Sequence, residues 1–122
     1  MKFTELELEA EILKALKEIG YEDMTPIQEL TMPHIVAGRD LLGLAETGSG
    51  KTGACAVPLI QRVDATTNAI QVLILVPTRE LALQYVTEIA SIATHTDVVP
   101  FAVFGGFDMG IQRAKLRHGV HI

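Results

Sequence analysis

A glycine-rich turn between two apolar segments constrains this chain more than any other feature. The turn runs from Ala45 to Thr52 with the sequence AETGSGKT, after the apolar run 41–44 and before an apolar stretch suited to a helix. Gly48 and Gly50 can adopt positive φ, so main-chain N–H groups can approach an anion closely, and the following helix presents its positive dipole end. This layout predicts a phosphate-binding loop that joins a buried strand to a helix.

The side chains of this turn are suited to a phosphorylated ligand with a metal ion. Lys51 would supply a point charge to the outer phosphates, and the Thr52 hydroxyl would be a Mg²⁺ ligand; these two are the candidate catalytic residues. Ala45 stands where the general pattern has glycine, which leaves open a simple turn with Lys51 as a solvated helix cap. The expected nucleotide-contacting residues of the loop are Ala45, Glu46, Thr47, Gly48, Ser49, Gly50, Lys51 and Thr52.

The remaining pattern alternates helical periodicity with short apolar runs. A capping box at Thr4 and Glu7 and a stop at Gly20 predict one helix, and Thr25-Pro26 predicts the start of another that Pro33 interrupts or restarts. We expect further helices after the glycine-rich turn and over about 79–95 and 109–117, and strands over 41–44, 72–76 and 98–104, with a last strand beginning at 120–122. This order predicts an α/β fold with a parallel sheet covered by helices on both faces.

Composition limits the possible functions. The 122 residues carry a net charge of −5, all of it from residues 1–29, so contact with a polyanion would have to be local. The single cysteine and the unpaired spacing of the four histidines give no reason to expect a disulfide or a structural metal. No apolar run approaches the roughly 18 residues that span a bilayer, and the first residues lack a signal-like region. We expect a cytoplasmic protein without a membrane partner.

Three more segments occur in order around the phosphate loop: GYEDMTPIQ at 20–28, PTRELA at 77–82 and the pair Gly105-Gly106. Together with the loop they resemble the motifs of the DEAD-box ATP-dependent RNA helicases over the whole chain. The resemblance implies a RecA-like phosphate-loop NTPase fold and ATP with Mg²⁺ as cofactors. It also implies a Q-motif helical region at 1–29 and, at 30–122, a partial ATP-binding domain that is incomplete at its carboxyl end.

The resemblance assigns an adenine pocket to the first segment. The Gln28 amide can donate and accept together, which suits the edge of adenine and would select ATP over GTP. The resemblance places Tyr21 against the base, Phe3 behind it as a brace, and Thr25 among the nucleotide-contacting residues. Taken alone, Gln28 would read as an ordinary surface helix residue and Tyr21 as a packing ring at a helix end.

The other two segments resemble RNA-backbone contacts. Hydroxyl, guanidinium and free N–H groups at a strand end can bind phosphate, and a diglycine lets a sugar-phosphate approach the main chain, so binding would be independent of sequence. A simple N-cap and a tight turn are the alternatives. The expected RNA-binding residues are Pro77, Thr78, Arg79, Glu80, Gly105 and Gly106.

The chain departs from the family pattern at Met24, usually proline, and at Glu46, frequently glutamine. It also contains no Thr-Pro-Gly-Arg, Asp-Glu-Ala-Asp or Ser-Ala-Thr element. We therefore expect a fragment that lacks a second RecA-like domain, folds poorly alone and is inactive by itself, although the intact parent would hydrolyse ATP to remodel or unwind RNA. The alternatives are a stand-alone nucleotide- or RNA-binding module without catalysis, and a DNA helicase or another phosphate-loop NTPase.

Overall fold

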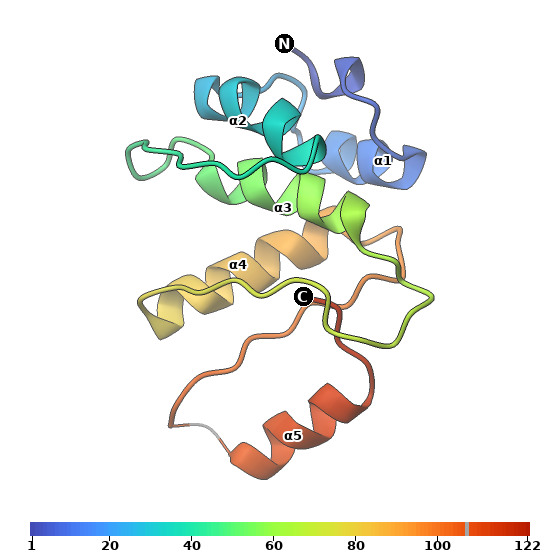
Figure 1. Ribbon diagram of the computed structural model, residues 1–122, viewed down its shortest axis with the longest axis vertical. Coiled ribbons are helices and arrows are strands. Elements are labelled where there is room, and N and C mark those ends of the chain that lie inside the picture. The colour runs from blue at the N-terminus through green and yellow to red at the C-terminus, as the bar shows by residue number, and fades with distance from the viewer. Residues whose placement is uncertain (107) are drawn as a thin grey trace.

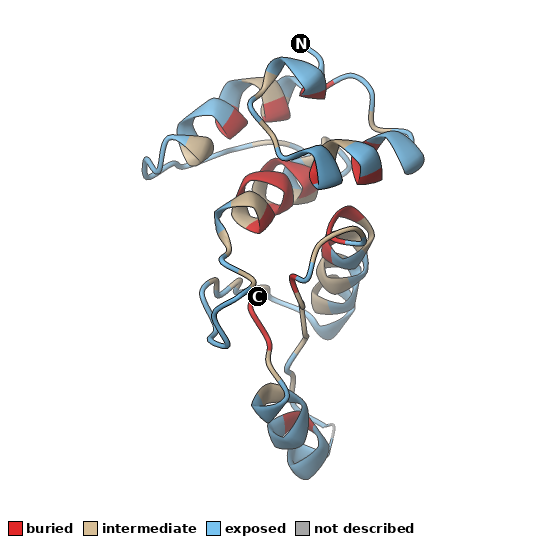
Figure 2. Cartoon of the chain, turned by 90° about the vertical axis from the view of Figure 1, so that its right-hand side faces the viewer, coloured by how far each residue is buried: buried red, intermediate tan, exposed pale blue. Residues whose placement is uncertain are grey.

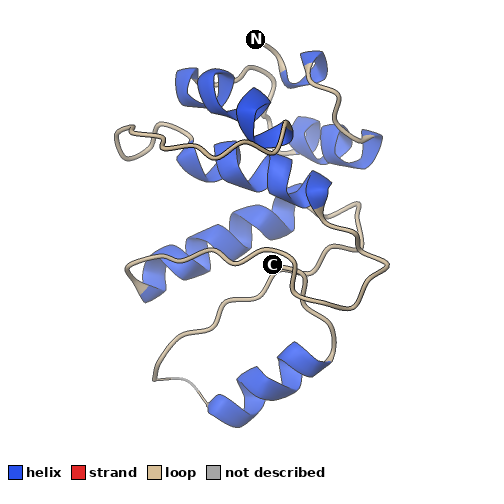
Figure 3. Cartoon of the chain, viewed as in Figure 1, coloured by secondary structure: helices blue, strands red, loops and turns tan. Residues whose placement is uncertain are grey.

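The computed structural model describes residues 1–106 and 108–122, and its regular structure is helical (Figures 1 and 3). The helix α3 lies between α2 and α4 and contacts both, while α5 lies at the far end of the molecule from α1 and α2 (Figure 1). The elements are a short 3₁₀ helix η1 at Phe3–Glu5, then α1 at Ala10–Glu18, α2 at Pro26–Val36, α3 at Lys51–Arg62, α4 at Arg79–Ile92 and α5 at Met109–Arg117.

The first helix begins later than the capping-box prediction placed it. Lys2 donates its main-chain N–H to the Glu5 carboxylate, which closes η1, and α1 then begins after Glu9. The predicted stop at Gly20 is confirmed: its φ is 82°, and the next N–H, of Tyr21, reaches back to the Leu16 carbonyl at 2.8 Å. Glycine suits this left-handed position because it has no β-carbon to clash.

The second helix starts where the sequence predicts, with Thr25 as N-cap and Pro26 as the first helical residue. The prediction that Pro33 interrupts this helix is wrong, because α2 continues through it to Val36. Proline lacks only one N–H, and the burial of Met32 beside it supplies the packing that holds the turn together.

The core forms where the helices face one another, and Figure 2 shows most of the buried residues there. Helix α3 contributes small and branched side chains, which allow α2 and α4 to approach it from opposite sides. The core side chains include Phe3, Ile12, Leu16, Met32, Ala54, Val57, Ile60, Ile89 and Ile92.

The predicted parallel sheet is not confirmed, because no strand is present in residues 1–106 and 108–122. The described residues contain one isolated bridge, between Lys2 and Asp23. The ranges 41–44, 72–76 and 98–104 are extended but form no ladder. The terminal segment does lie between two of these ranges. The His121 carbonyl accepts from the Gln71 and Val72 N–H groups, and the His121 N–H donates to the Val99 carbonyl at 2.9 Å. These few bonds bring the segments together but do not build regular strands.

The extended segments leave apolar side chains uncovered. Leu42 and Leu44 before the glycine-rich turn are each 86% exposed, and Leu73 and Leu75 are 78% and 85% exposed. An apolar cavity of about 250 Å³ lies between the 70–76 segment, α4 and the 100–103 segment. Among the described residues, no helix is long and apolar enough to cross a membrane.

Candidate nucleotide-binding site

Gln28 joins the second helix to the glycine-rich turn. Its side chain is 3% exposed; Oε1 accepts from the Thr25 N–H at 3.0 Å and Nε2 donates to the Gly50 carbonyl at 3.2 Å. One amide hydrogen and one carbonyl lone pair remain for another partner. The same amide fills the space above Gly53, where a β-carbon would lie 2.9 Å from Nε2.

The turn itself has the backbone that the sequence predicts. Gly48 and Gly50 have φ of 79° and 95°, and a β-carbon on Gly50 would lie 2.6 Å from the Thr25 hydroxyl. Lys51 opens α3 and donates its ammonium to the Ala45 carbonyl at 2.6 Å, so the loop folds over its own lysine. The Ser49 hydroxyl is buried without a hydrogen-bond partner among the described residues. The unpaired Ser49 hydroxyl, and a Lys51 ammonium that could move from the Ala45 carbonyl to a ligand, suit this loop to binding an anion.

The aromatic side of the site is built by η1 and the residue after Gly20. Phe3 is 2% exposed and stacks on the Tyr21 ring with centroids 6.1 Å apart and planes 24° apart. The Tyr21 hydroxyl donates to the Glu88 carboxylate at 2.8 Å. The pKa of Tyr21 is raised to about 12, mainly by partial burial and to a smaller extent by this hydrogen bond to a carboxylate.

An open pocket of about 510 Å³ lies between these parts, lined in part by Tyr21, Thr25, Gln28, Gly48 and Gly50. The sequence-predicted aromatic, amide and glycine residues therefore meet at one place, although Gln28 and Gly50 are 22 residues apart. Of the other predicted loop residues, Glu46 and Thr47 are exposed, and Thr52 is half-buried in the first turn of α3.

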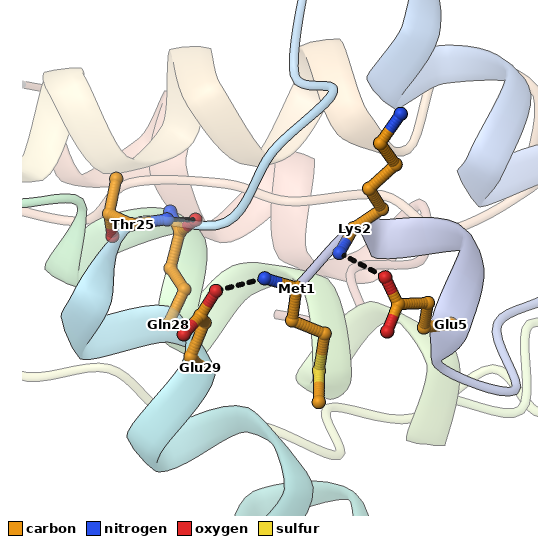
Figure 4. Close-up of polar contacts among 6 residues, drawn as sticks. All are labelled: Met1, Lys2, Glu5, Thr25, Gln28 and Glu29. Carbon is orange, nitrogen blue, oxygen red and sulfur yellow. Dashed lines mark hydrogen bonds and ion pairs between the residues drawn. The ribbon is translucent and has the colours of Figure 1, made fainter.

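A charged contact secures the outer edge of this region. Glu29, the neighbour of Gln28, forms an ion pair with the Met1 amino group, and Figure 4 shows it beside the Thr25–Gln28 contact. The Met1 carbonyl also accepts from the Met24 N–H at 2.9 Å. Met24, where the family pattern has proline, thus uses an N–H that proline would lack.

The structure brings the predicted RNA-binding residue Arg79 to Gly105 and Gly106, and both Thr78 and Arg79 use their side chains in hydrogen bonds within the protein. Thr78 is the N-cap of α4, and its hydroxyl accepts from the Leu81 N–H at 3.2 Å. Arg79 donates to the Gly105 carbonyl at 2.9 Å, and its guanidinium lies 5.2 Å from the centroid of the Phe104 ring. Gly106, with φ of 81°, leaves room for this guanidinium. Pro77 and Glu80 are exposed beside it.

Sequence reasoning missed Glu88, Gly53 and Phe104. Glu88 lies 67 residues from Tyr21, and Gly53 is one more residue in an apolar helical stretch. Phe104 reads as the end of an apolar run. Local patterns carry no signal for such contacts, because each depends on how separate helices and loops pack.

Known proteins are similar to this chain over nearly all of its length. A family model described as DEAD/DEAH box helicase matches residues 25–122. The ATP-dependent RNA helicase DeaD of Escherichia coli K12 is 45% identical over 121 residues, which are 98% of this chain and 19% of that protein. CshA of Listeria monocytogenes, also an ATP-dependent RNA helicase, is 41% identical over 99% of this chain and 23% of its own length.

Solved structures show the same likeness. A DEAD box protein from Methanococcus jannaschii superposes with a TM-score of 0.94 at 36% identity, over 99% of this chain and 33% of that one. The RNA helicase Prp28 from Chaetomium thermophilum, bound to ADP, gives a TM-score of 0.83 at 36% identity over 94% of this chain and 29% of that one. The chain thus spans about a fifth of DeaD's length. With a family model covering most of its residues, it belongs to the DEAD/DEAH box helicases.

Proposed function

We propose that this chain is the part of an ATP-dependent RNA helicase that binds ATP with Mg²⁺ and contacts RNA through its backbone. Its RecA-like ATP-binding region would comprise residues 30–122, with residues 1–29 as a Q-motif region. Helix α2 runs through that boundary, so the two regions share a helix. DeaD and CshA are several times longer than this chain, and catalysis would take place in the full-length protein.

The observation that supports the proposal best is the bond from the Gln28 amide to the Gly50 carbonyl. This bond joins an amide that can hydrogen-bond to adenine with a loop that can bind phosphates. Both line one pocket of about 510 Å³, which is large enough for a nucleotide. An occupant with a base at one end and phosphates at the other would use both. Tyr21, stacked on Phe3, provides the apolar wall for a base.

Each side chain then has a definite task. Lys51 would leave the Ala45 carbonyl for the outer phosphates, and the N–H groups of the loop and of α3 would hold the remaining oxygens. Thr52 would ligate Mg²⁺, which when bound neutralises charge on the phosphate oxygens. Glu46 and Thr47, both exposed, would form the outer lip of the loop.

For RNA, the proposal uses the surface formed by Pro77, Thr78, Arg79, Glu80, Gly105 and Gly106. Arg79 would act partly by holding the Gly105–Gly106 turn open to a phosphate, since it already bonds to the Gly105 carbonyl. The free N–H groups at the start of α4 would bind a second phosphate.

The test is Lys51→Ala in the full-length protein, with Lys14→Ala as the control because Lys14 is an exposed lysine on α1. RNA-stimulated ATP hydrolysis should be abolished in the first variant and unchanged in the second, because only Lys51 is placed to neutralise phosphate charge. Turnover should be faster with ATP than with GTP and stimulated by RNA more than by DNA. Retained turnover in Lys51→Ala would refute the assignment of Lys51, and equal stimulation by DNA would refute RNA as the partner.

A further inference from the structure

The contact between Tyr21 and Glu88 brings a second helix to the edge of the nucleotide pocket. The tyrosine hydroxyl donates to the carboxylate at 2.8 Å, across 67 residues of sequence. Glu88 is in the middle of α4, and Tyr21 directly follows the glycine that ends α1. The pocket of about 510 Å³ is lined by Tyr21 and not by Glu88, so the carboxylate meets the tip of the tyrosine from outside the pocket lining.

The ring of Tyr21 has few other directional restraints. One face meets the buried Phe3 ring, and its Cε2 lies 3.5 Å from the place where a β-carbon on Gly53 would be. The stacking is an apolar contact, and Gly53 leaves space beside the ring, so neither selects one tilt. Among residues 1–106 and 108–122, the hydrogen bond at the tip of the side chain is the only directional contact of this ring.

We propose that Glu88 is a positioning residue for nucleotide binding: its carboxylate holds the Tyr21 ring at the tilt that makes it a wall for the base, without touching the nucleotide. This inference rests on the proposed function. It assigns to α4, the helix that begins at the RNA-facing Arg79, a second task at the nucleotide pocket.

The chemistry of Tyr21 and Glu88 favours a hydrogen bond that persists at neutral pH. With its pKa raised to about 12, the Tyr21 hydroxyl keeps its proton at neutral pH and remains a donor. Hydrogen bonds to a charged acceptor are stronger than neutral ones. The half-buried position of Glu88 reduces competition from water. A glutamine at position 88 could still accept from the hydroxyl, whereas an alanine could not.

The test measures dissociation constants of a fluorescent ADP analogue and of pyrophosphate, which needs only the phosphate loop, in the full-length protein. The variants are Tyr21→Phe, Glu88→Ala, Glu88→Gln and the double variant Tyr21→Phe/Glu88→Ala. The controls are Tyr85→Phe, a partly buried tyrosine of α4, and Glu11→Ala, an exposed carboxylate of α1. Lys51→Ala reports on the proposed nucleotide site itself.

We expect Tyr21→Phe and Glu88→Ala each to weaken the ADP analogue by about three- to tenfold, the worth of one hydrogen bond. The double variant should be no weaker than either single variant, because both remove the same contact. Glu88→Gln and both controls should stay close to the unmodified protein. Pyrophosphate should bind the Tyr21 and Glu88 variants and both controls equally, since the effect is confined to the base.

Several results would overturn the inference. Additive losses in the double variant would mean that the two residues act separately, and an equal loss of pyrophosphate affinity would mean that Glu88 only supports the fold. Unchanged ADP affinity in Glu88→Ala, together with loss of binding in Lys51→Ala, would reject the positioning role while leaving the proposed function standing. If the unmodified protein binds no ADP analogue, both fall together.

Discussion

At the residue scale, the amide of Gln28 shows how a buried polar group ties two elements together. It is 3% exposed and bonds to both the Thr25 N–H and the Gly50 carbonyl. Gln28→Met keeps the volume but leaves both groups unpaired, which should lower the free energy of unfolding by about 1 to 3 kcal/mol. Urea unfolding of the full-length protein measures this. Gln84→Met, at an exposed position of α4, is the control, and equal losses in the two variants would contradict the prediction.

The tyrosine hydroxyl at position 21 predicts a dependence of stability on alkaline pH. Its folded pKa of about 12 lies above the ordinary tyrosine pKa of 10.0, so the neutral form is favoured in the folded state. The stabilisation is complete below pH 10 and is lost as pH rises toward 12, because only the unfolded chain then releases the proton. The slope of stability against pH in this window should be shallower in Tyr21→Phe. The difference in phenolate absorbance between the unmodified protein and Tyr21→Phe, followed against pH, isolates the titration of Tyr21. Its midpoint should lie well above 10, and a midpoint near 10 would contradict the hydrogen bond to Glu88.

At the element scale, the turn between the 98–104 segment and α5 depends on one glycine and not on its neighbour. Gly106 has φ of 81°, and a β-carbon there would lie 2.8 Å from the Arg79 guanidinium, whereas Gly105 has open space around it. Gly106→Ala should strain the turn by roughly 1 to 2 kcal/mol and displace Arg79. RNA affinity, measured in a salt titration, should fall further for Gly106→Ala than for Gly105→Ala. Equal losses in the two variants would contradict this role of Gly106.

Helices and extended segments differ in how far local patterns determine them. The bounds of α5 at Met109–Arg117 and the start of α2 at Pro26 follow from periodicity and capping residues, since helix bonds are local. The apolar run 72–76 indicates a strand equally strongly, yet a strand exists only when a neighbour supplies the other half of each bond. In the described residues the His121 carbonyl supplies bonds at one end of that run, so the ladder does not form.

At the scale of the whole molecule, exposed leucines on the extended segments make the isolated polypeptide prone to associate. Leu42, Leu44, Leu73 and Leu75 are each at least 78% exposed, on segments that form no strand within the described residues. We expect the 122-residue polypeptide to form soluble oligomers or aggregates by light scattering and to lack a single cooperative thermal transition. The variant Leu42→Ser/Leu73→Ser should associate less. A monomer with sharp near-UV dichroism and a cooperative transition would show that the core of α1 to α4 suffices.

The amino-acid sequence by itself determined that the helices exist, that Gly48 and Gly50 are left-handed, and to which family the chain belongs. All of these depend on short-range rules or on motifs whose spacing is visible along the chain, such as Gly50-Lys51-Thr52. Only the tertiary structure decided that Glu88 accepts from the Tyr21 hydroxyl, that Arg79 donates to the Gly105 carbonyl, and that the apolar runs form no sheet within the described residues. Contacts between distant segments depend on which surfaces meet in packing, and no local pattern records that choice.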